Sequence, residues 1–106
     1  MEIVQLERYL KTIGVGTRLQ ILKDIHHGPL CICDLTASLN MSQPAVSQHM
    51  RRLKEEQIVL DDKRGKRTFW SLNTEHPHHF ILLQLLDLLP DQEIAKQCCT
   101  NEWEDR

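Results

Sequence analysis

Apolar side chains recur at helical spacing through the first 26 residues. Those at positions 3, 6, 10 and 13 predict an amphipathic helix that ends at Gly14 and Gly16. A second helix is predicted to begin after Thr17, a favourable N-cap residue, with its buried side at positions 19, 22 and 25. The histidines, glycine and proline of residues 26–29 are expected to end it.

Residues 34–57 predict two further helices separated by a tight polar turn. The third helix spans about 34–39, and residues 40–42 form the turn. Ser42 can cap a fourth helix that has Pro44 in its first turn and runs to about Gln57. Its apolar residues, at positions 46, 50 and 53, form a narrow inward stripe. Two helices joined by a three-residue turn, the second polar on its other faces, are typical of a helix-turn-helix.

The second half of the chain predicts a hairpin and a last helix. Residues 58–60 and 68–72 have strand character, and residues 61–67 form a turn around Gly65. Residues 80–89 predict an almost wholly apolar helix that ends at Pro90. Such a helix either forms an interface with a second chain or packs under the first helix of its own chain. The predicted fold is mainly α with a small β-hairpin, a homodimeric winged helix-turn-helix of order α-α-α-α-β-β-α.

Charge is unevenly distributed along the chain, although the formal net charge is only −2. Residues 42–67 carry seven basic and four acidic side chains, whereas residues 68–106 carry two basic and seven acidic ones. A local positive field attracts a polyanion even when the whole chain is acidic. We therefore expect one DNA-binding and dimerisation domain over residues 1–90 and an acidic extension over residues 91–106.

The polar helix and the basic hairpin supply the candidate DNA contacts. Amide and hydroxyl groups near the start of the helix suit base edges, and flexible cations suit phosphates. The predicted DNA-binding residues are Ser42, Gln43, Ser47, Gln48, His49, Arg51, Arg52, Lys63, Arg64, Lys66 and Arg67. The expected partner is a double-stranded operator with an inverted repeat, read by a homodimer.

Several function classes are excluded by what the sequence lacks. No apolar run reaches the roughly 20 residues that span a bilayer, and the N-terminus lacks a secretory signal pattern, so a cytoplasmic protein without membrane association is expected. No phosphate-binding loop, nucleophile elbow or carboxylate pair is present. A thiol oxidoreductase would need alternating strands and helices, which the pattern does not predict. We therefore expect no enzymatic activity.

Four cysteines occur as a Cys-x-Cys pair, Cys31 and Cys33, and a vicinal pair, Cys98 and Cys99. In a reducing compartment such pairs favour metal or redox chemistry over structural disulfides. Residues i and i+2 point about 200° apart on a regular helix, so both thiols can hold one ion only in an extended segment or at a helix start. The alternative is that Cys31 and Cys33 are simply small, partly buried apolar residues.

The chain resembles the ArsR/SmtB family of metal- and metalloid-responsive winged-helix repressors. The resemblance covers roughly residues 5–90 and is carried by TRLQIL (17–22), LCICDL (30–35), SQPAVSQHMRRLKEEQIV (42–59) and KRGKRTFWSL (63–72), in the family's order and spacing. It implies a homodimeric repressor that leaves its operator when an inducer binds. The arsenic-sensing members are the most similar. They carry a third cysteine three residues after the second of the pair, and Thr36 occupies that position here.

Thiolates select soft inducers, which are As(III), Sb(III), Cd(II), Pb(II) and Zn(II), and As(III) is expected first. Two sulfurs are too few for a closed site. Completion is expected from Cys98 and Cys99, in the same chain or the partner chain, or from a small exogenous thiol. No permanent cofactor is expected.

Three alternatives remain open from the sequence. A redox sensor would join Cys31 or Cys33 to the tail cysteines in a reversible disulfide. A zinc site like that of some relatives would use His76 with Asp87 as an oxygen ligand, although Thr74 and Pro90 depart from the family's ligands. A DNA-binding protein without any inducer is the third.

Overall fold

The computed structural model describes residues 2–90, and the tail cysteines and the predicted acidic extension lie outside this range. Four helices come first: α1 (Ile3–Ile13), α2 (Gly16–His26), α3 (Ile32–Leu39) and α4 (Gln43–Glu55). A hairpin of β2 (Val59–Arg64) and β3 (Arg67–Leu72) and then α5 (His79–Leu86) follow. This order confirms the predicted winged helix-turn-helix.

A short strand, β1 (Leu30–Cys31), was missed by the sequence prediction. It pairs antiparallel with β3, where Leu30 is opposite Trp70 and Cys31 is opposite Phe69. The sheet therefore has three strands in the order β1-β3-β2. This pairing places the segment just before α3 against the second strand of the hairpin.

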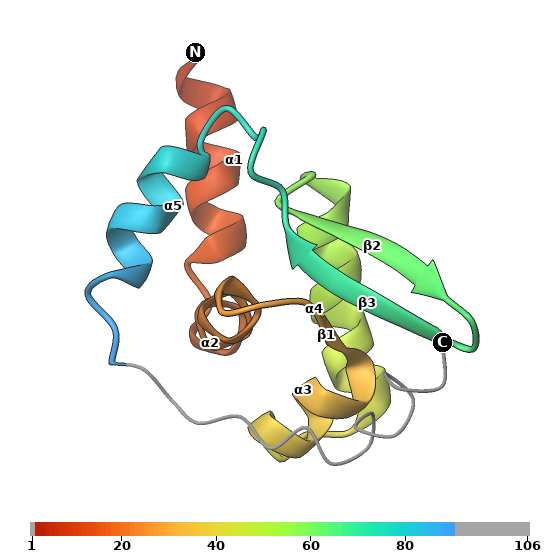
Figure 1. Cartoon of the computed structure of the whole chain (residues 1–106). Coiled ribbons are helices and arrows are strands. Elements are labelled where there is room, and N and C mark those ends of the chain that lie inside the picture. The colour runs from red at the N-terminus through yellow and green to blue at the C-terminus, as the bar shows by residue number, and fades with distance from the viewer. Residues whose placement is uncertain (1, 91–106) are drawn as a thin grey trace.

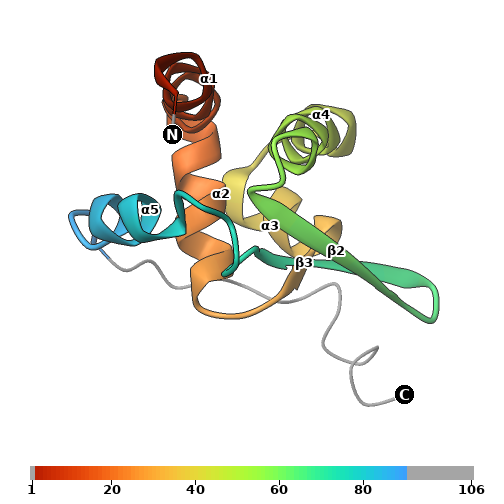
Figure 2. The ribbon, with the colours of Figure 1, turned by 90° about the horizontal axis from the view of Figure 1, so that it is seen from above.

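The hairpin is longer than predicted because its turn is shorter. Arg64 pairs with Arg67, so only Gly65 and Lys66 form the loop, and residues 61–64, expected to be turn, belong to β2. Gly65 has a φ of 63° at the first loop position, where two-residue hairpin turns require a positive φ. The extended hairpin projects from the side of the molecule opposite to α1 and α5 (Figures 1 and 2).

The predicted helix boundaries hold with small shifts. Thr17 is not the N-cap of α2, because Val15 is the N-cap and the helix begins at Gly16, two residues earlier than expected. Helix α3 begins two residues before the predicted start. Helix α4 ends at Glu55, because Gln57 adopts a positive φ of 61°. Within residues 2–90 no helix is long and apolar enough to cross a membrane.

One core joins all five helices to the sheet. It contains the predicted stripe of α4, whose Val46, Met50 and Leu53 are all fully buried. Leu82 and Leu86 bring α5 into the same core. A buried polar contact fixes α3 on α2, since Ser38 Oγ donates to Asp24 Oδ2 at 3.2 Å. Helix α4, the second helix of the helix-turn-helix and below called the reading helix, is thus held by the core on one side and exposed on the other.

The outer faces of α1 and α5 carry apolar side chains that the core leaves uncovered. On α1, Ile3 and Leu10 are 85% and 44% exposed. Phe80 in α5 and Leu88 just after it are 71% and 79% exposed. Large exposed apolar surfaces of this kind mark contact sites in soluble proteins. The last helix therefore packs one face in the core, and Phe80 leaves another face uncovered in the single chain.

Candidate nucleic-acid interface and thiol site

Helix α4 begins as the sequence predicts. Ser42 is its N-cap, and Ser42 Oγ accepts a hydrogen bond from the backbone N–H of Ala45 at 3.3 Å. Opposite the buried stripe, Pro44, Gln48, Arg51 and Glu55 form an exposed line at helical spacing. The cap hydroxyl is therefore already used within the helix, while Gln48 and Arg51 are fully available on the outer face.

The remaining polar residues near the helix start differ in accessibility. Gln43 is exposed, and Ser47 is half-buried. His49 lies on the side toward α2, where Arg18 Nε donates to His49 Nδ1 at 3.1 Å. Burial and the Arg18 charge both lower the pKa of His49, so the ring is held neutral. Only the other ring nitrogen of His49 is left for a base.

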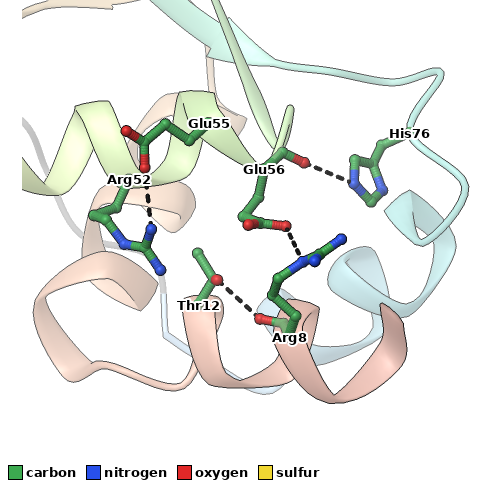
Figure 3. Close-up of polar contacts among 6 residues, drawn as sticks. All are labelled: Arg8, Thr12, Arg52, Glu55, Glu56 and His76. Carbon is green, nitrogen blue, oxygen red and sulfur yellow. Dashed lines mark hydrogen bonds and ion pairs between the residues drawn. The ribbon is translucent and has the colours of Figure 1, made fainter. Parts of the chain in front are cut away.

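Three of the predicted phosphate-binding cations, together with Lys54, lie beside a carboxylate or the thiol cluster. Arg52 pairs with Glu55 at 3.0 Å on the side of α4 that faces α1, as Figure 3 shows. Lys54 pairs with Asp61 at 2.8 Å across to β2. Arg64 pairs with Asp62 at 2.9 Å, and Arg67 points to α3 as described below. The exposed cations for which the described residues supply no ion pair are Arg51, Lys63 and Lys66.

The two cysteines lie at the very start of α3, as their use as a pair requires. Cys31 is disulfide-bonded in the structure, and Cys33 carries a free thiol. Cys31 is the N-cap residue, with an extended φ of −92° and ψ of 170°, and Cys33 is in the first helical turn. Cys31 and Asp34 form a capping box in which the Cys31 N–H donates to Asp34 Oδ2 at 3.4 Å. Both sulfur atoms therefore belong to the first residues of one helix.

A small cluster at the wing encloses the thiols. Cys31 and Phe69 are almost completely buried against each other, and Cys33 packs on the same cluster. Arg67 Nη1 donates a hydrogen bond to Cys33 Sγ at 2.7 Å. The Arg64 guanidinium carbon lies 5.8 Å from the centroid of the Phe69 ring. The thiol pair therefore touches α3, which supports α4, and the wing strand β3 at once.

The sequence analysis missed Phe69 and the thiol contact of Arg67. One signal was available, since Arg67 and Phe69 are two apart on a strand and so share a face. What places that face over the thiols is the pairing of Cys31 with Phe69, which no local pattern encodes.

A polar junction ties the end of α4 to α1 and to residues 76–78, which precede α5. Arg8 Nε donates to Glu56 Oε1 at 3.1 Å, and the Glu56 carbonyl lies 3.1 Å from His76 Nε2 (Figure 3). The other ring nitrogen of His76 accepts from the His78 N–H at 3.0 Å. Tyr9 adds a hydrogen bond to the His78 carbonyl at 3.2 Å, and burial raises the pKa of Tyr9 to about 12.

This junction bears on the histidine alternative. Both ring nitrogens of His76 are engaged, Nδ1 as acceptor and Nε2 as donor, so the one lone pair of the neutral ring is already used by the His78 N–H. Across residues 2–90, no three His, Cys, Asp or Glu side chains are grouped to hold a metal ion. That finding includes the cysteine pair, since the described residues add no third donor of these types to Cys31 and Cys33.

Acidification is expected to destabilise this junction. Burial lowers the pKa of His76 below its ordinary value of 6.5, so the unfolded chain takes up this proton before the folded one does. Neutral His76 therefore contributes to the free energy of unfolding above about pH 6.5, and this contribution is lost as the pH falls below that value. Urea unfolding at about pH 7.5 and about pH 5.5 measures the difference in the free energy of unfolding between the two pH values. His76→Gln should reduce this difference, whereas His26→Gln, at an exposed position, should leave it unchanged. An equal pH dependence in wild type and His76→Gln would contradict this assignment.

Known proteins resemble this chain in both sequence and fold. Residues 16–60 match the family described as bacterial regulatory protein, arsR family. The chain is 32% identical over 100 residues to the arsenical resistance operon repressor of Staphylococcus xylosus, covering 92% of each protein. The crystal structure of the transcriptional regulator HlyU from Vibrio vulnificus CMCP6 superposes with a TM-score of 0.72 at 29% identity, over 82% of this chain and 90% of that one.

A second structure supports the fold alone. The homodimeric winged helix-turn-helix DNA-binding domain of Mb0332 from Mycobacterium bovis gives a TM-score of 0.68 at 21% identity, over 86% of this chain and 90% of that one. Similarity to the S. xylosus repressor along nearly the full length of both chains, together with the matched helix-turn-helix, confirms the resemblance noted from the sequence. These relatives are transcriptional regulators, and none is an enzyme. The chain belongs to the ArsR family of DNA-binding transcriptional repressors.

Proposed function

We propose that this repressor binds an inverted-repeat operator as a homodimer and leaves it when As(III) bonds to Cys31 and Cys33. The observation that carries the proposal is the position of the two thiols at the start of α3, packed on Phe69 of the wing. The name of the S. xylosus relative, an arsenical resistance operon repressor, favours As(III) over other soft inducers. Sb(III), Cd(II), Pb(II) and Zn(II) share the same ligand preference.

The chemistry of arsenous acid matches a two-thiol site that is incomplete. Each thiol that forms an S–As bond displaces one hydroxyl of As(OH)₃ as water, so two thiols leave one hydroxyl on arsenic. That hydroxyl can be replaced by a further thiol from Cys98, Cys99 or a small molecule. Binding at the start of α3 would displace the helix that packs under α4, and the reading helix would move with it.

The homodimer is supported by the uncovered apolar faces of α1 and α5 and by the homodimeric state of the M. bovis domain. In a dimer of this kind the two reading helices face successive turns of the major groove. Gln43, Ser47, Gln48 and His49 would lie near base edges. Phosphates would be contacted by Arg51, Arg52, Lys63, Arg64 and Lys66.

Release from DNA is the decisive experiment. The probe is a fluorescent duplex carrying an inverted repeat that the wild-type protein selects from a random pool. Titration with As(III) is expected to release wild type, while Cys31→Ser and Cys33→Ser stay bound. Serine is a suitable replacement because it retains an N-cap at position 31 and a hydrogen-bond acceptor at position 33.

Parallel titrations separate the alternatives. Release by peroxide but not by As(III) would identify the redox sensor, and release by Zn(II) that survives both serine substitutions would identify a histidine site. Linkage adds a second check, since DNA must weaken As(III) binding by the factor by which As(III) weakens DNA binding. Equal As(III) affinity with and without DNA would refute the proposal.

A further inference from the structure

The contact between Arg67 and Cys33 connects the thiol pair directly to the wing. The two residues are 34 positions apart, and Arg67 Nη1 lies 2.7 Å from Cys33 Sγ. Arg67 is the first residue of β3, next to the two-residue turn. The hydrogen bond therefore holds the hairpin to α3 close to its tip, where a small displacement moves the wing most.

Neighbouring contacts make this attachment specific to one face of the hairpin. Phe69 lies on the same face of β3 as Arg67 and is 1% exposed against the thiols. The Arg64 guanidinium lies over the Phe69 ring. By contrast, Lys63 and Lys66 at the tip are exposed to solvent. The hairpin thus presents one set of side chains to the thiol cluster and another to the outside.

The strength of the hydrogen bond from Arg67 to Cys33 depends on the electron density of the sulfur, which an inducer bonded to the sulfur would reduce. Hydrogen bonds from a cation are strongest to an acceptor that carries negative charge. Once Cys33 Sγ is bonded to arsenic or to a divalent metal, one of its lone pairs is shared and the sulfur carries less negative charge. The sulfur can still accept a hydrogen bond, but the bond from the guanidinium is weaker, and a cationic inducer repels the guanidinium. Inducer binding at Cys33 therefore weakens the contact with Arg67.

We propose that Arg67 is a positioning residue that couples occupancy of Cys33 to the orientation of the wing. In the inducer-free protein the hydrogen bond fixes the hairpin in its DNA-binding orientation, and inducer binding releases it. This inference rests on the proposed function, in which Cys33 binds the inducer. It gives the switch two outputs, one through α3 to the reading helix and one through Arg67 to the wing.

A double-mutant cycle tests the contact without any inducer. Cys33→Ala removes the acceptor and Arg67→Gln removes the donor's charge, and each is expected to weaken operator binding. The double variant should bind no more weakly than the worse single variant, with a non-additivity in the roughly 2- to 150-fold range of residues in contact. Additive losses would overturn the inference, because they would mean that Arg67 acts independently of the sulfur.

Salt and inducer dependence then separate positioning from phosphate contact, with Lys66→Gln as the matched control. Both variants remove one wing charge. Lys66→Gln should lower the salt slope of operator binding by about 0.9 for each protomer, or about 1.8 for the proposed dimer, and leave the fold-release by As(III) unchanged. Arg67→Gln should keep the salt slope and reduce the fold-release, which is typically about 5- to 150-fold in such switches.

The outcomes distinguish the two proposals. If As(III) does not release wild type, the proposed function fails, while the double-mutant cycle still decides whether Arg67 acts through the sulfur. If wild type is released and Arg67→Gln is released to the same extent with a lower salt slope, the inference fails and the proposed function stands. Circular dichroism checks folding, and Arg67→Lys provides a second variant that keeps the charge but lacks the planar fork. Full release and unchanged affinity in Arg67→Lys, together with additive losses in the cycle, would also overturn the inference.

Discussion

Phe80→Glu is expected to give a folded monomer that has lost nearly all affinity for the operator. Phe80 is 71% exposed in the single chain, so the substitution removes no core contact, whereas Leu82 and Leu86 of the same helix are 1% exposed and hold α5 in place. In the proposed dimer a buried carboxylate at this position would have no partner and would oppose association. A monomer binds one half-site and forfeits an avidity gain of roughly 10²- to 10⁴-fold.

Sedimentation of the variant measures the oligomeric state, and binding to the selected duplex measures the affinity. His26→Glu is the matched control, because it introduces the same charge at an exposed position at the end of α2. The control should sediment as wild type and keep its affinity. A dimeric Phe80→Glu protein with unchanged operator binding would exclude α5 from the interface.

The reading helix could be predicted from sequence because all of its signals are local. Ser42 supplies the cap and Pro44 the first turn. The stripe of Val46, Met50 and Leu53 decides which face is buried, and each of the three is fully buried in the structure. A helix is set by contacts between residues three and four apart, so a short window of sequence holds most of the information.

The thiol site could be predicted only in part, because its walls come from distant segments. The sequence predicted that Cys31 and Cys33 need a helix start, and the structure confirms that geometry. It could not predict β1, since a two-residue strand has no periodicity and exists only through its pairing with β3. Phe69 and Arg67 reach the thiols through that same pairing.

Charge counting identified the basic region but not the direction of each side chain. Arg52 and Arg64 were both predicted on phosphates, yet each has a carboxylate within 3.0 Å. His49 was predicted near a base, and Arg18 holds one of its nitrogens. Which cations are available for DNA depends on tertiary neighbours that charge patterning does not include.

Thr36→Cys is expected to raise As(III) affinity by roughly 10²-fold, because a third thiol on the same helix binds as an intramolecular ligand. Position 36 lies one turn after Cys33 on the same side of α3, and Thr36 Oγ1 donates to the Cys33 carbonyl at 2.9 Å. A thiol at this position can displace the last hydroxyl of arsenous acid, which two thiols leave in place. Operator release should then need correspondingly less As(III).

The variant also tests where the wild-type site finds its third donor. If Cys98 and Cys99 complete the site, replacing both by serine should weaken As(III) binding in wild type and have no effect in the Thr36→Cys background. Ser38→Cys is the matched control, because it makes the same hydroxyl-to-thiol change at a side chain that points to Asp24 in α2. A gain in Ser38→Cys equal to that in Thr36→Cys would show that any added thiol suffices. No gain from Thr36→Cys in a protein whose Cys98 and Cys99 are both replaced by serine would mean that arsenic does not bind at the start of α3.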